Sequence, residues 1–395
     1  MNYILFDEFI ARKNMLPLTF IRPIAEIRFG ILTMREKWEH FLGQKTSTLT
    51  EHYLLPKYPI HEESDNILIN ASFQPEQPMV EKVMALKPHQ ALVYGDHIIA
   101  MYVFYGEKAS QEGEKDLEMI EYQGSPLKLN YPWDIFSHNH EAIRHDWPLV
   151  TAGKKSAGFG KGSHVIAPEN VFVEEGARVS HAMINATDSL VYIGKNAEVM
   201  EGAMIRGSLA LCDHAIVRMG ARVYGATTIG PWSKIGGELD NVVVFGYTNK
   251  AHGGFIGNSV IGEWCNMGAD TNSSNLKNNY DLVKVWNYYE KSFIETGLQF
   301  VGVIMGDHTK TGINTMLNTG TVIGVSANIF GSGFPRAFIP SFSWGGASGF
   351  TSFDFGKAAE IAERVFARRN VPFDHKERSI LKSVHQSTHV FRKKN

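Results

Sequence analysis

The sequence contains only two cysteines, Cys212 and Cys265, and no Cys-x-x-Cys pair. This scarcity excludes a disulfide framework and a Cys-x-x-Cys zinc site, so we expect two free thiols. The chain also lacks any run of eighteen apolar residues. Its first residues carry Asp7 and Glu8 inside a short apolar stretch, which is not typical of a secretory signal. We therefore expect a soluble, cytoplasmic protein.

Neither sign of charge is in excess. The chain has 39 Lys and Arg residues against 41 Asp and Glu residues, which gives a formal net charge of −2. Charged residues make up 20% and hydrophobic residues 44% of the chain, an ordinary globular composition. This composition argues against a disordered chain and against a generic binder of nucleic acid. The length of 395 residues is enough for two or three domains.

Glycine is scarce in the first part of the chain, where residues 1–150 hold only six of the 37 glycines. In residues 1–130, short strand-like runs alternate with a helical stretch at 31–41, a pattern that predicts a small α/β domain. The strand-like runs are residues 3–6, 66–70, 91–93 and 98–104.

Three further segments follow this domain. Residues 131–150 predict a connecting helix closed by Pro148. Residues 151–350 are rich in glycine and form a separate predicted domain. Residues 351–395 predict a C-terminal helix followed by a basic tail, in which residues 376–395 carry six Lys and Arg residues against one Glu. We expect this tail to be a solvated surface rather than a ligand contact.

The glycine-rich segment contains an internal repeat with a period of six residues. Eight aliphatic residues follow one another at this spacing, and most residues four places after each of them are small. A second run in the same style comes later in the chain. The first run is Ile193, Val199, Ile205, Leu211, Val217, Val223, Ile229 and Ile235, and the second is Met305, Thr311, Leu317, Ile323 and Ile329.

A period of six predicts a parallel β-helix in which each hexad is a short strand plus a corner. Because six is even, the inward and outward alternation of a strand is preserved from one hexad to the next. Gly and Asn at corners, such as Gly194, Gly230 and Asn318, permit positive φ. The aliphatic residues would then stack coil upon coil, about 4.8 Å apart, into a continuous core. A sandwich or barrel is the alternative, but its strands would show irregular spacing of about 8 to 12 residues.

The repeat is interrupted twice, between Ile235 and Ile256 and again between Met267 and Met305. Segments that leave a rigid scaffold are where chemistry tends to be placed. We therefore expect the functional residues of this half to lie in or beside these two interruptions.

Hexads of the form aliphatic-Gly-x-x-small-x resemble those of the hexapeptide-repeat acyltransferases. Within that superfamily the sequence is similar to the bifunctional UDP-N-acetylglucosamine pyrophosphorylase/glucosamine-1-phosphate N-acetyltransferase family, in an alternate, shortened version. The resemblance implies an N-terminal nucleotidyltransferase-like α/β domain, a connecting helix, and an all-β left-handed parallel β-helix with a C-terminal helix. It also implies a homotrimer that binds acetyl-CoA between neighbouring subunits.

The segment HGGFIGNSVIGEWCNMGADT, which begins at His252, carries the most specific part of this resemblance. It reproduces the irregular spacing of five and then six residues between Ile256, Ile261 and Met267. The resemblance implies that His252 is the base that deprotonates the sugar amine. It implies that Glu238, fourteen residues earlier, is the carboxylate of the same site.

The resemblance also implies a set of substrate-binding residues. Asn266 falls on the family's sugar-contacting asparagine, and the Asn-Tyr-Asp sequence at 279–281 resembles its sugar loop. The family has a lysine two residues after the glutamate, where this chain has Asp240. Two other lysines therefore remain to meet a sugar phosphate. The implied substrate-binding residues are Asn266, Lys250, Lys234, Asn279 and Tyr280.

The chemistry of acetyl transfer requires these residue types. Amide formation from a thioester needs an amine freed of its proton, and histidine can take that proton at neutral pH. Glu238 would orient the imidazole or bind the amine, and backbone N–H groups at 253–254 would stabilise the oxyanion. The alternative is that His252 is one of 16 histidines and is merely solvated at a glycine-rich corner.

The N-terminal half resembles the sugar nucleotidyltransferases less closely. Leu5, Arg12 and Pro17 keep the spacing of the family's opening, Leu-x-x-Gly-x-Gly-Thr-Arg followed by Pro-Leu-Thr. The glycines are missing, and Asp7 and Glu8 fall in the loop that should cradle a triphosphate. A backbone phosphate nest needs glycine and is weakened by nearby negative charge.

Three residues of this half remain as candidates for nucleotide chemistry. Arg12 and Arg22 are the candidate nucleotide-binding residues. Asp96 is the candidate Mg²⁺ ligand, although Gly-Asp between two apolar runs is also typical of a hairpin turn.

The sequence thus predicts a sugar-phosphate transferase of nucleotide-sugar and cell-wall biosynthesis. Its β-helix would N-acetylate an amino-sugar phosphate with acetyl-CoA, and its nucleotidyltransferase domain would be degenerate or altered. One alternative is a uridylyl- or thymidylyltransferase whose β-helix only oligomerises, and another is a non-catalytic scaffold or sensor. A hexapeptide carbonic anhydrase would need zinc-binding histidines about five residues apart, whereas Tyr247 lies five residues before His252.

Overall fold

The computed structural model describes residues 1–104 and 117–392. The chain divides into two compact units. The first comprises residues 1–15, 22–27 and 32–130, and the second comprises residues 16–21, 28–31 and 131–395. Among the described helices, none combines the length and the apolar character that crossing a membrane would require.

The first unit is built on a mixed six-stranded sheet with strand order β4-β1-β5-β7-β6-β8. β1 is parallel to both of its neighbours, whereas β7 is antiparallel to β5 and β6. The predicted α/β character of this region is confirmed. The strands are β1 (Asn2–Phe6), β3 (Leu32–Thr33), β4 (Ser47–Leu49), β5 (Asp65–Asn70), β6 (Gln90–Tyr94), β7 (His97–Phe104) and β8 (Glu118–Glu121), and the helices are α1 (Phe9–Asn14), α2 (Met34–Leu42) and α3 (Gln77–Met84).

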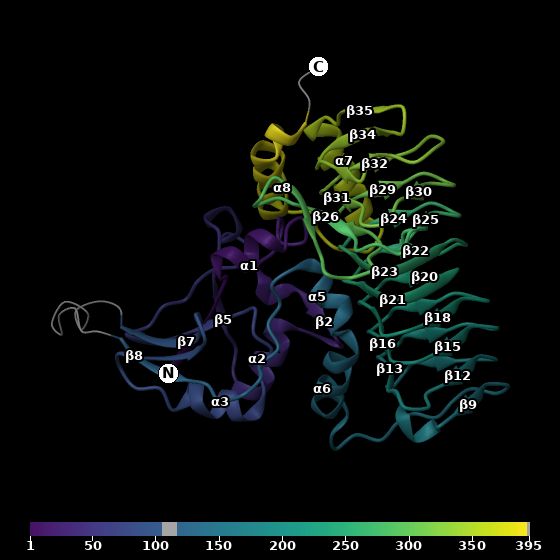
Figure 1. The fold of residues 1–395 in the computed structure, drawn as a ribbon. Coiled ribbons are helices and arrows are strands. Elements are labelled where there is room, and N and C mark those ends of the chain that lie inside the picture. The colour runs from purple at the N-terminus through teal and green to yellow at the C-terminus, as the bar shows by residue number, and fades with distance from the viewer. Residues whose placement is uncertain (105–116, 393–395) are drawn as a thin grey trace. The chain divides into compact units, whose positions relative to one another are not determined.

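The second unit is a parallel β-solenoid whose coils have three faces, as the stacked strands in Figure 1 show. Face 1 consists of β10 (Val171–Val173), β13 (Val191–Ile193), β16 (Leu209–Leu211), β19 (Thr227–Ile229), the second halves of β21 (Glu238–Val244) and β23 (Phe255–Ile261), β28 (Ile304–Met305), β31 (Val322–Ile323) and β33 (Phe338–Ile339). Face 2 consists of β9 (His164–Ile166), β12 (Met183–Asn185), β15 (Met204–Arg206), β18 (Arg222–Tyr224), the first halves of β21 and β23, β25 (Asn272–Ser273) and β30 (Met316–Leu317). Face 3 consists of β11 (Arg178–Val179), β14 (Glu198–Val199), β17 (Ile216–Val217), β20 (Lys234–Ile235), β22 (Asn249–Lys250), β24 (Asn266–Met267), β29 (Lys310–Thr311), β32 (Asn328–Ile329) and β34 (Ser343–Gly346), which closes the face as a hairpin with β35 (Gly349–Ser352).

The predicted six-residue register is confirmed by the core of this solenoid. Every aliphatic residue of the first hexad run is buried inside the coils, from Ile193 to Ile235, and the second run is buried in the same way. The sequence predicts that the chain leaves the solenoid between Ile235 and Ile256, and this prediction is wrong. The coils continue through this segment, because β21 and β23 each bend around a corner. The bend shortens the step between successive inward positions from six residues to five.

The second interruption is a true excursion from the solenoid. After β25 the chain forms the hairpin of β26 (Lys284–Asn287) and β27 (Ser292–Glu295) before it returns at β28. Trp286 of this hairpin stacks on Phe338 with ring centroids 4.2 Å apart. The excursion therefore packs against face 1.

The helices of the second unit differ from the sequence prediction in two places. The predicted single connector is α5 (Pro132–Ser137) followed by α6 (Asn139–Thr151), and Pro148 lies inside α6 rather than at its end. A proline removes only one backbone donor, and here the following turn still closes, with Ala152 N–H donating to the Pro148 carbonyl at 3.1 Å.

The remaining strand of this unit is β2 (Arg28–Phe29).

The C-terminal segment contains two helices, α7 (Phe355–Ala367) and α8 (His375–Ser387). Much of the predicted basic tail is therefore helical. Arg392 is half-buried and donates to the Ser341 carbonyl at 3.1 Å, which ties the end of the chain to the solenoid. Lys393 and Lys394 of the predicted tail lie outside the described residues.

One inward position of the solenoid is occupied by a charged residue. Lys250 lies opposite Ile235 in the register of face 3 and is only 2% exposed. Its Nζ donates to the carbonyl oxygens of His252 at 2.6 Å and Gly253 at 2.5 Å. Burial lowers the pKa of Lys250 to about 8.

We expect Ile205→Asp to lower the melting temperature sharply. Ile205 is buried in the stacked core, so the substitution would bury a carboxylate without a partner, at a cost of several kcal/mol. Glu201→Lys, at an exposed corner of the same solenoid, is the control and should be nearly neutral. Thermal unfolding followed by circular dichroism compares the two, and equal effects would contradict the register.

The pKa of Lys250 predicts a pH dependence of stability. Because this pKa is about 8 in the folded chain and ordinarily 10.5, the unfolded chain binds more protons between these values. The free energy of unfolding should therefore rise with pH across this window. Lys250→Met removes this contribution, so the stability difference between wild type and variant should move in favour of wild type as the pH rises. Denaturant midpoints measured at about pH 7.5 and about pH 9.5 test this. A difference independent of pH would contradict it.

Candidate functional site

A groove of about 670 Å³ runs along face 3 of the solenoid. Its floor is a ladder of polar side chains, each of which precedes an inward residue and therefore points outward. Adjacent members of the ladder are partners in the strand register, so the ladder crosses successive coils in a straight line. It consists of Lys234, Asn249, Asn266, Lys310 and Asn328.

Helix α7 forms the other wall of this groove. Ile361 and Val365 line the groove from α7, and Arg368 and Arg369 line it just beyond the end of the helix. Phe366 fixes the helix by stacking on Trp264 of the solenoid, with ring centroids 3.9 Å apart. Ile361 and Val365 are four residues apart and therefore lie on the same face of α7, which points toward the solenoid.

The groove is strongly cationic. Lys234, Lys310, Arg368 and Arg369 all line it, and Arg369 donates to Asn249 Oδ1 at 3.2 Å. The pKa of Lys234 is lowered by burial and by the neighbouring arginines. Burial lowers the pKa of Lys310 to about 8, and its Nζ is held by the carbonyl oxygens of His308 at 2.7 Å and Trp264 at 3.0 Å. An anionic ligand would relieve this concentration of positive charge.

His252 lies at one edge of the same groove. It belongs to the turn that joins β22 on face 3 to β23 on face 2, and its side chain is exposed. The buried Nζ of Lys250 holds the carbonyl groups of His252 and Gly253, so the turn is fixed from inside the solenoid. The structure therefore brings His252, Asn266 and Lys234 to one groove, while Lys250 supports it from below.

Glu238 lies close to this turn but faces a different way. Its backbone N–H donates to the Gly254 carbonyl at 3.2 Å, whereas its side chain belongs to face 2. One carboxylate oxygen accepts from the Tyr224 hydroxyl at 2.6 Å, and the other pairs with Arg222 at 2.7 Å. The carboxylate of Glu238 is therefore engaged by neighbours on its own face.

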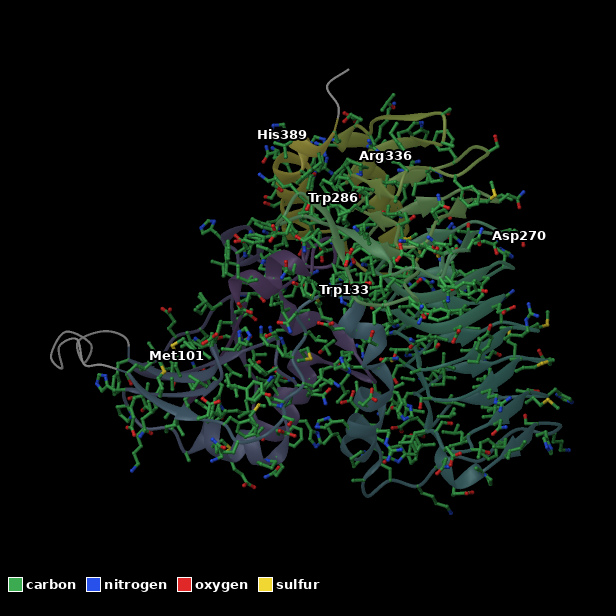
Figure 2. All side chains as sticks on the ribbon, viewed as in Figure 1. Met101, Trp133, Asp270, Trp286, Arg336 and His389 are labelled. Atoms are coloured by element: carbon green, nitrogen blue, oxygen red, sulfur yellow. The ribbon has the colours of Figure 1, made fainter. Side chains whose placement is uncertain are left out.

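Asn279 and Tyr280 are not among the residues that line the groove with His252. Both lie in the excursion after β25, and Tyr280 is 67% exposed. Trp286, which belongs to the same excursion, lies on the side of the solenoid opposite to the corner that carries Asp270 (Figure 2). The turn with His252 is at that corner, one coil before Asp270.

In the first unit, Arg12 and Arg22 are both buried. Arg12 Nη1 donates to Asp7 at 2.9 Å and to the Arg22 carbonyl at 3.1 Å. Asp7 also accepts from the Ile24 backbone N–H at 2.7 Å and from the hydroxyl of Thr50. Burial raises the pKa of Asp7, although the charge of Arg12 opposes this. The loop after β1 is thus held together by its own side chains, and nucleotide binding by Arg12 and Arg22 stays a prediction.

Asp96 lies in the exposed turn between β6 and β7, next to Gly95 with a φ of 54°. Within residues 1–104 and 117–392, no three His, Cys, Asp or Glu side chains lie close enough together to hold a metal ion. The residues around Asp96 therefore give no support to a Mg²⁺ site, and we derive no step through one. Both cysteines are buried, and neither forms a disulfide within the described residues.

Three of the four cations of the groove were not predicted from the sequence, namely Lys310, Arg368 and Arg369. A signal for Lys310 was present, because it precedes the inward Thr311 just as Lys234 precedes Ile235. No such signal exists for the two arginines, since their positions depend on how α7 packs against the solenoid.

Comparison with known proteins supports the two-part reading of the chain. A profile of the family described as "Sugar nucleotidyl transferase" matches residues 3–155. The chain is 27% identical over 217 residues to the "Bifunctional sugar-1-phosphate nucleotidylyltransferase/acetyltransferase" of Sulfurisphaera tokodaii, which covers 54% of this chain and 47% of that protein. It is 25% identical over 210 residues to the "Bifunctional protein GlmU" of Methanococcus vannielii, covering 53% and 44% of the two chains.

Among solved structures, the UDP-N-acetylglucosamine acyltransferase from Campylobacter jejuni matches with a TM-score of 0.28 and 12% identity, over 59% of this chain and 83% of that one. The chain spans about half the length of the curated relatives that it matches. The resemblance predicted from the sequence is confirmed. Residues 3–155 match the model of the sugar nucleotidyl transferase family, and a parallel β-helix follows them. The chain is similar in sequence to proteins named as bifunctional nucleotidylyltransferase/acetyltransferase and as GlmU.

Proposed function

We propose that the β-helix transfers an acetyl group from acetyl-CoA to the amine of an amino-sugar phosphate, with His252 as the general base. The observation that carries this proposal is the cationic groove of face 3, which ends at His252. Acetyl-CoA has several phosphate groups and a long, thin arm. A groove that crosses several coils and carries four cationic side chains fits both its charge and its shape. The similarity to a nucleotidylyltransferase/acetyltransferase supports the same reaction.

In this reaction the sugar ammonium group first loses one proton to solvent, and His252 accepts a second proton from the amine as its nitrogen attacks the thioester carbonyl carbon. A carbon–nitrogen bond forms, the carbon–sulfur bond breaks, and the CoA thiolate takes the proton from the imidazolium. Lys250 is a positioning residue, because it holds the backbone of the His252 turn before either substrate binds. Asn266 and Lys234, which lie on the groove floor, would hold the substrate beside the imidazole.

A homotrimer would give a role to the two predicted substrate-binding residues that do not line the groove of His252. Asn279 and Tyr280 would complete the site of a neighbouring subunit, since their excursion leaves the solenoid on another side. Face 2 offers a surface for such a neighbour. It carries exposed Met183 and Met204 in adjacent coils, beside a hollow of about 860 Å³.

We expect His252→Ala to lower kcat for acetyl transfer by roughly 10²–10⁴-fold while leaving acetyl-CoA binding nearly unchanged. The reason is that the proton is removed only on the way to the transition state, whereas the donor is held by the cations of the groove. The measurement is thiol release from acetyl-CoA with glucosamine-1-phosphate as acceptor. His181→Ala is the control, because His181 is an exposed histidine at the equivalent corner of an earlier coil. An active His252→Ala protein would defeat the assignment.

The family match over residues 3–155 favours a second candidate activity, sugar-1-phosphate uridylyl or thymidylyl transfer by the first unit. The contacts within that unit argue for a weak activity. Arg12 and Asp7 are paired with each other, and Glu8 pairs with Lys128 at 2.9 Å, where a glycine loop would otherwise approach phosphates.

We therefore expect pyrophosphorolysis of UDP-N-acetylglucosamine to be feeble or absent, even with Mg²⁺ present. Formation of UTP from the nucleotide sugar and pyrophosphate, followed by chromatography, measures it. Rapid UTP formation that is lost in Arg12→Ala would contradict this expectation and would show that the altered loop still binds nucleotide. The melting temperature of the Arg12→Ala protein checks that the variant is folded.

A further inference from the structure

Two cavities lie near the turn that carries His252. One is the cationic groove on face 3, and the other is a cavity of about 510 Å³ that begins one coil later on the side of face 2. Polar groups of the second cavity come from Asp270, Asn272, Asn314 and Ser332, and apolar groups come from Ile313 and Met316. The two cavities thus have opposite character, because one is lined by cations and the other by a carboxylate and amides.

Asp270 is in contact with the turn that holds His252. A Cβ atom built on Gly253 would lie 2.5 Å from Asp270 Oδ1, so the carboxylate packs directly against that glycine. The charge of Asp270 also reaches the buried Lys250, whose protonated form it favours. Figure 2 shows Asp270 at the outer edge of the solenoid, and the residue is exposed.

The turn at Asp270 is held in place before any ligand binds. Asn272 Nδ2 donates to the Asp270 carbonyl at 2.9 Å, and Asn272 Oδ1 accepts from the Phe255 backbone N–H at 2.7 Å. Among the described residues, the Asp270 carboxylate accepts no hydrogen bond and has no cation within 4 Å. Glu238, by contrast, is engaged by Arg222 and Tyr224. Asp270 can therefore accept a hydrogen bond from a further cation, whereas the Glu238 carboxylate is already paired.

We propose that Asp270 binds the ammonium group of the acceptor, so that the amino sugar approaches His252 from face 2 while the CoA donor lies along face 3. This assignment rests on the function proposed above. The ammonium group donates a charge-assisted hydrogen bond to Asp270 and then loses one proton to solvent. The amine nitrogen forms its bond to the acetyl carbon while His252 accepts its second proton, and the CoA sulfur departs from that carbon and takes this proton from the imidazolium.

The test compares two ligands that differ only at the reacting group. Glucosamine-1-phosphate has the amine, and glucose-1-phosphate has a hydroxyl in its place. Isothermal titration calorimetry of the full chain, with CoA bound and at a pH where the amine is protonated, gives both affinities. Asp270→Asn should weaken binding of glucosamine-1-phosphate about tenfold and leave glucose-1-phosphate unchanged, because only the charged pair is lost.

Asp188→Asn is the matched control. Asp188 is also an exposed aspartate at a solenoid corner, with a φ of 57° against 55° for Asp270, and asparagine tolerates this conformation. The control should bind both sugars as the wild type does. Equal losses for the two sugars in Asp270→Asn, no loss at all, or a wild type without preference for the amine would each overturn the proposal.

Turnover separates this proposal from the proposed function. One outcome is that acetyl transfer depends on His252 but the Asp270→Asn protein keeps the wild-type preference for the amine. That outcome would overturn the role of Asp270 and leave the proposed function intact. The opposite outcome is that Asp270→Asn loses the preference for the amine but the wild-type chain transfers no acetyl group. That outcome would support Asp270 as the ammonium site and overturn the proposed reaction.

Discussion

The stacking of inward side chains at a spacing of about 4.8 Å is the constraint on which the rest of the second unit depends. Each coil must present one residue to the core at each face, so the residue before it must point outward. This is why five polar side chains from five coils form one straight ladder on face 3. The line of the groove is therefore a consequence of core packing. Its chemical character is set by the outward positions, which do not contribute to the core.

Lys250 is the position where the core departs from this rule. A protonated amine inside the solenoid costs free energy, which its two hydrogen bonds to the His252 and Gly253 carbonyls offset in part. An aliphatic side chain at the same place would pack as Ile235 does, but it would leave both carbonyl groups and the turn without that support. Stability is given up at the coil where the candidate base is held, which is typical of functional sites.

The register made most of the solenoid predictable from the sequence. Ile205 and its equivalents fall at fixed intervals, and Lys310 could have been placed by the same counting. The coils between Ile235 and Ile256 could not, because β21 and β23 bend around a corner and the interval falls below six. The groove wall formed by α7 could not be predicted either. Arg369 contacts Asn249, which is 120 residues away in the sequence, and this contact depends on the packing of α7 through Phe366 on Trp264. Periodicity reports local repeats, whereas the docking of a helix depends on side chains far apart in sequence.

The opposite charges of the two cavities beside His252 also bear on how a reaction there would finish. In the proposed reaction the donor and the acceptor both carry phosphate, so the cations of face 3 would not by themselves separate one from the other. The acceptor differs in its ammonium group, and a carboxylate at Asp270 attracts only that group. Acetylation turns the ammonium into a neutral amide, so the product loses this attraction at the moment it forms. The same carboxylate that orients the acceptor would then favour release of the product over its retention.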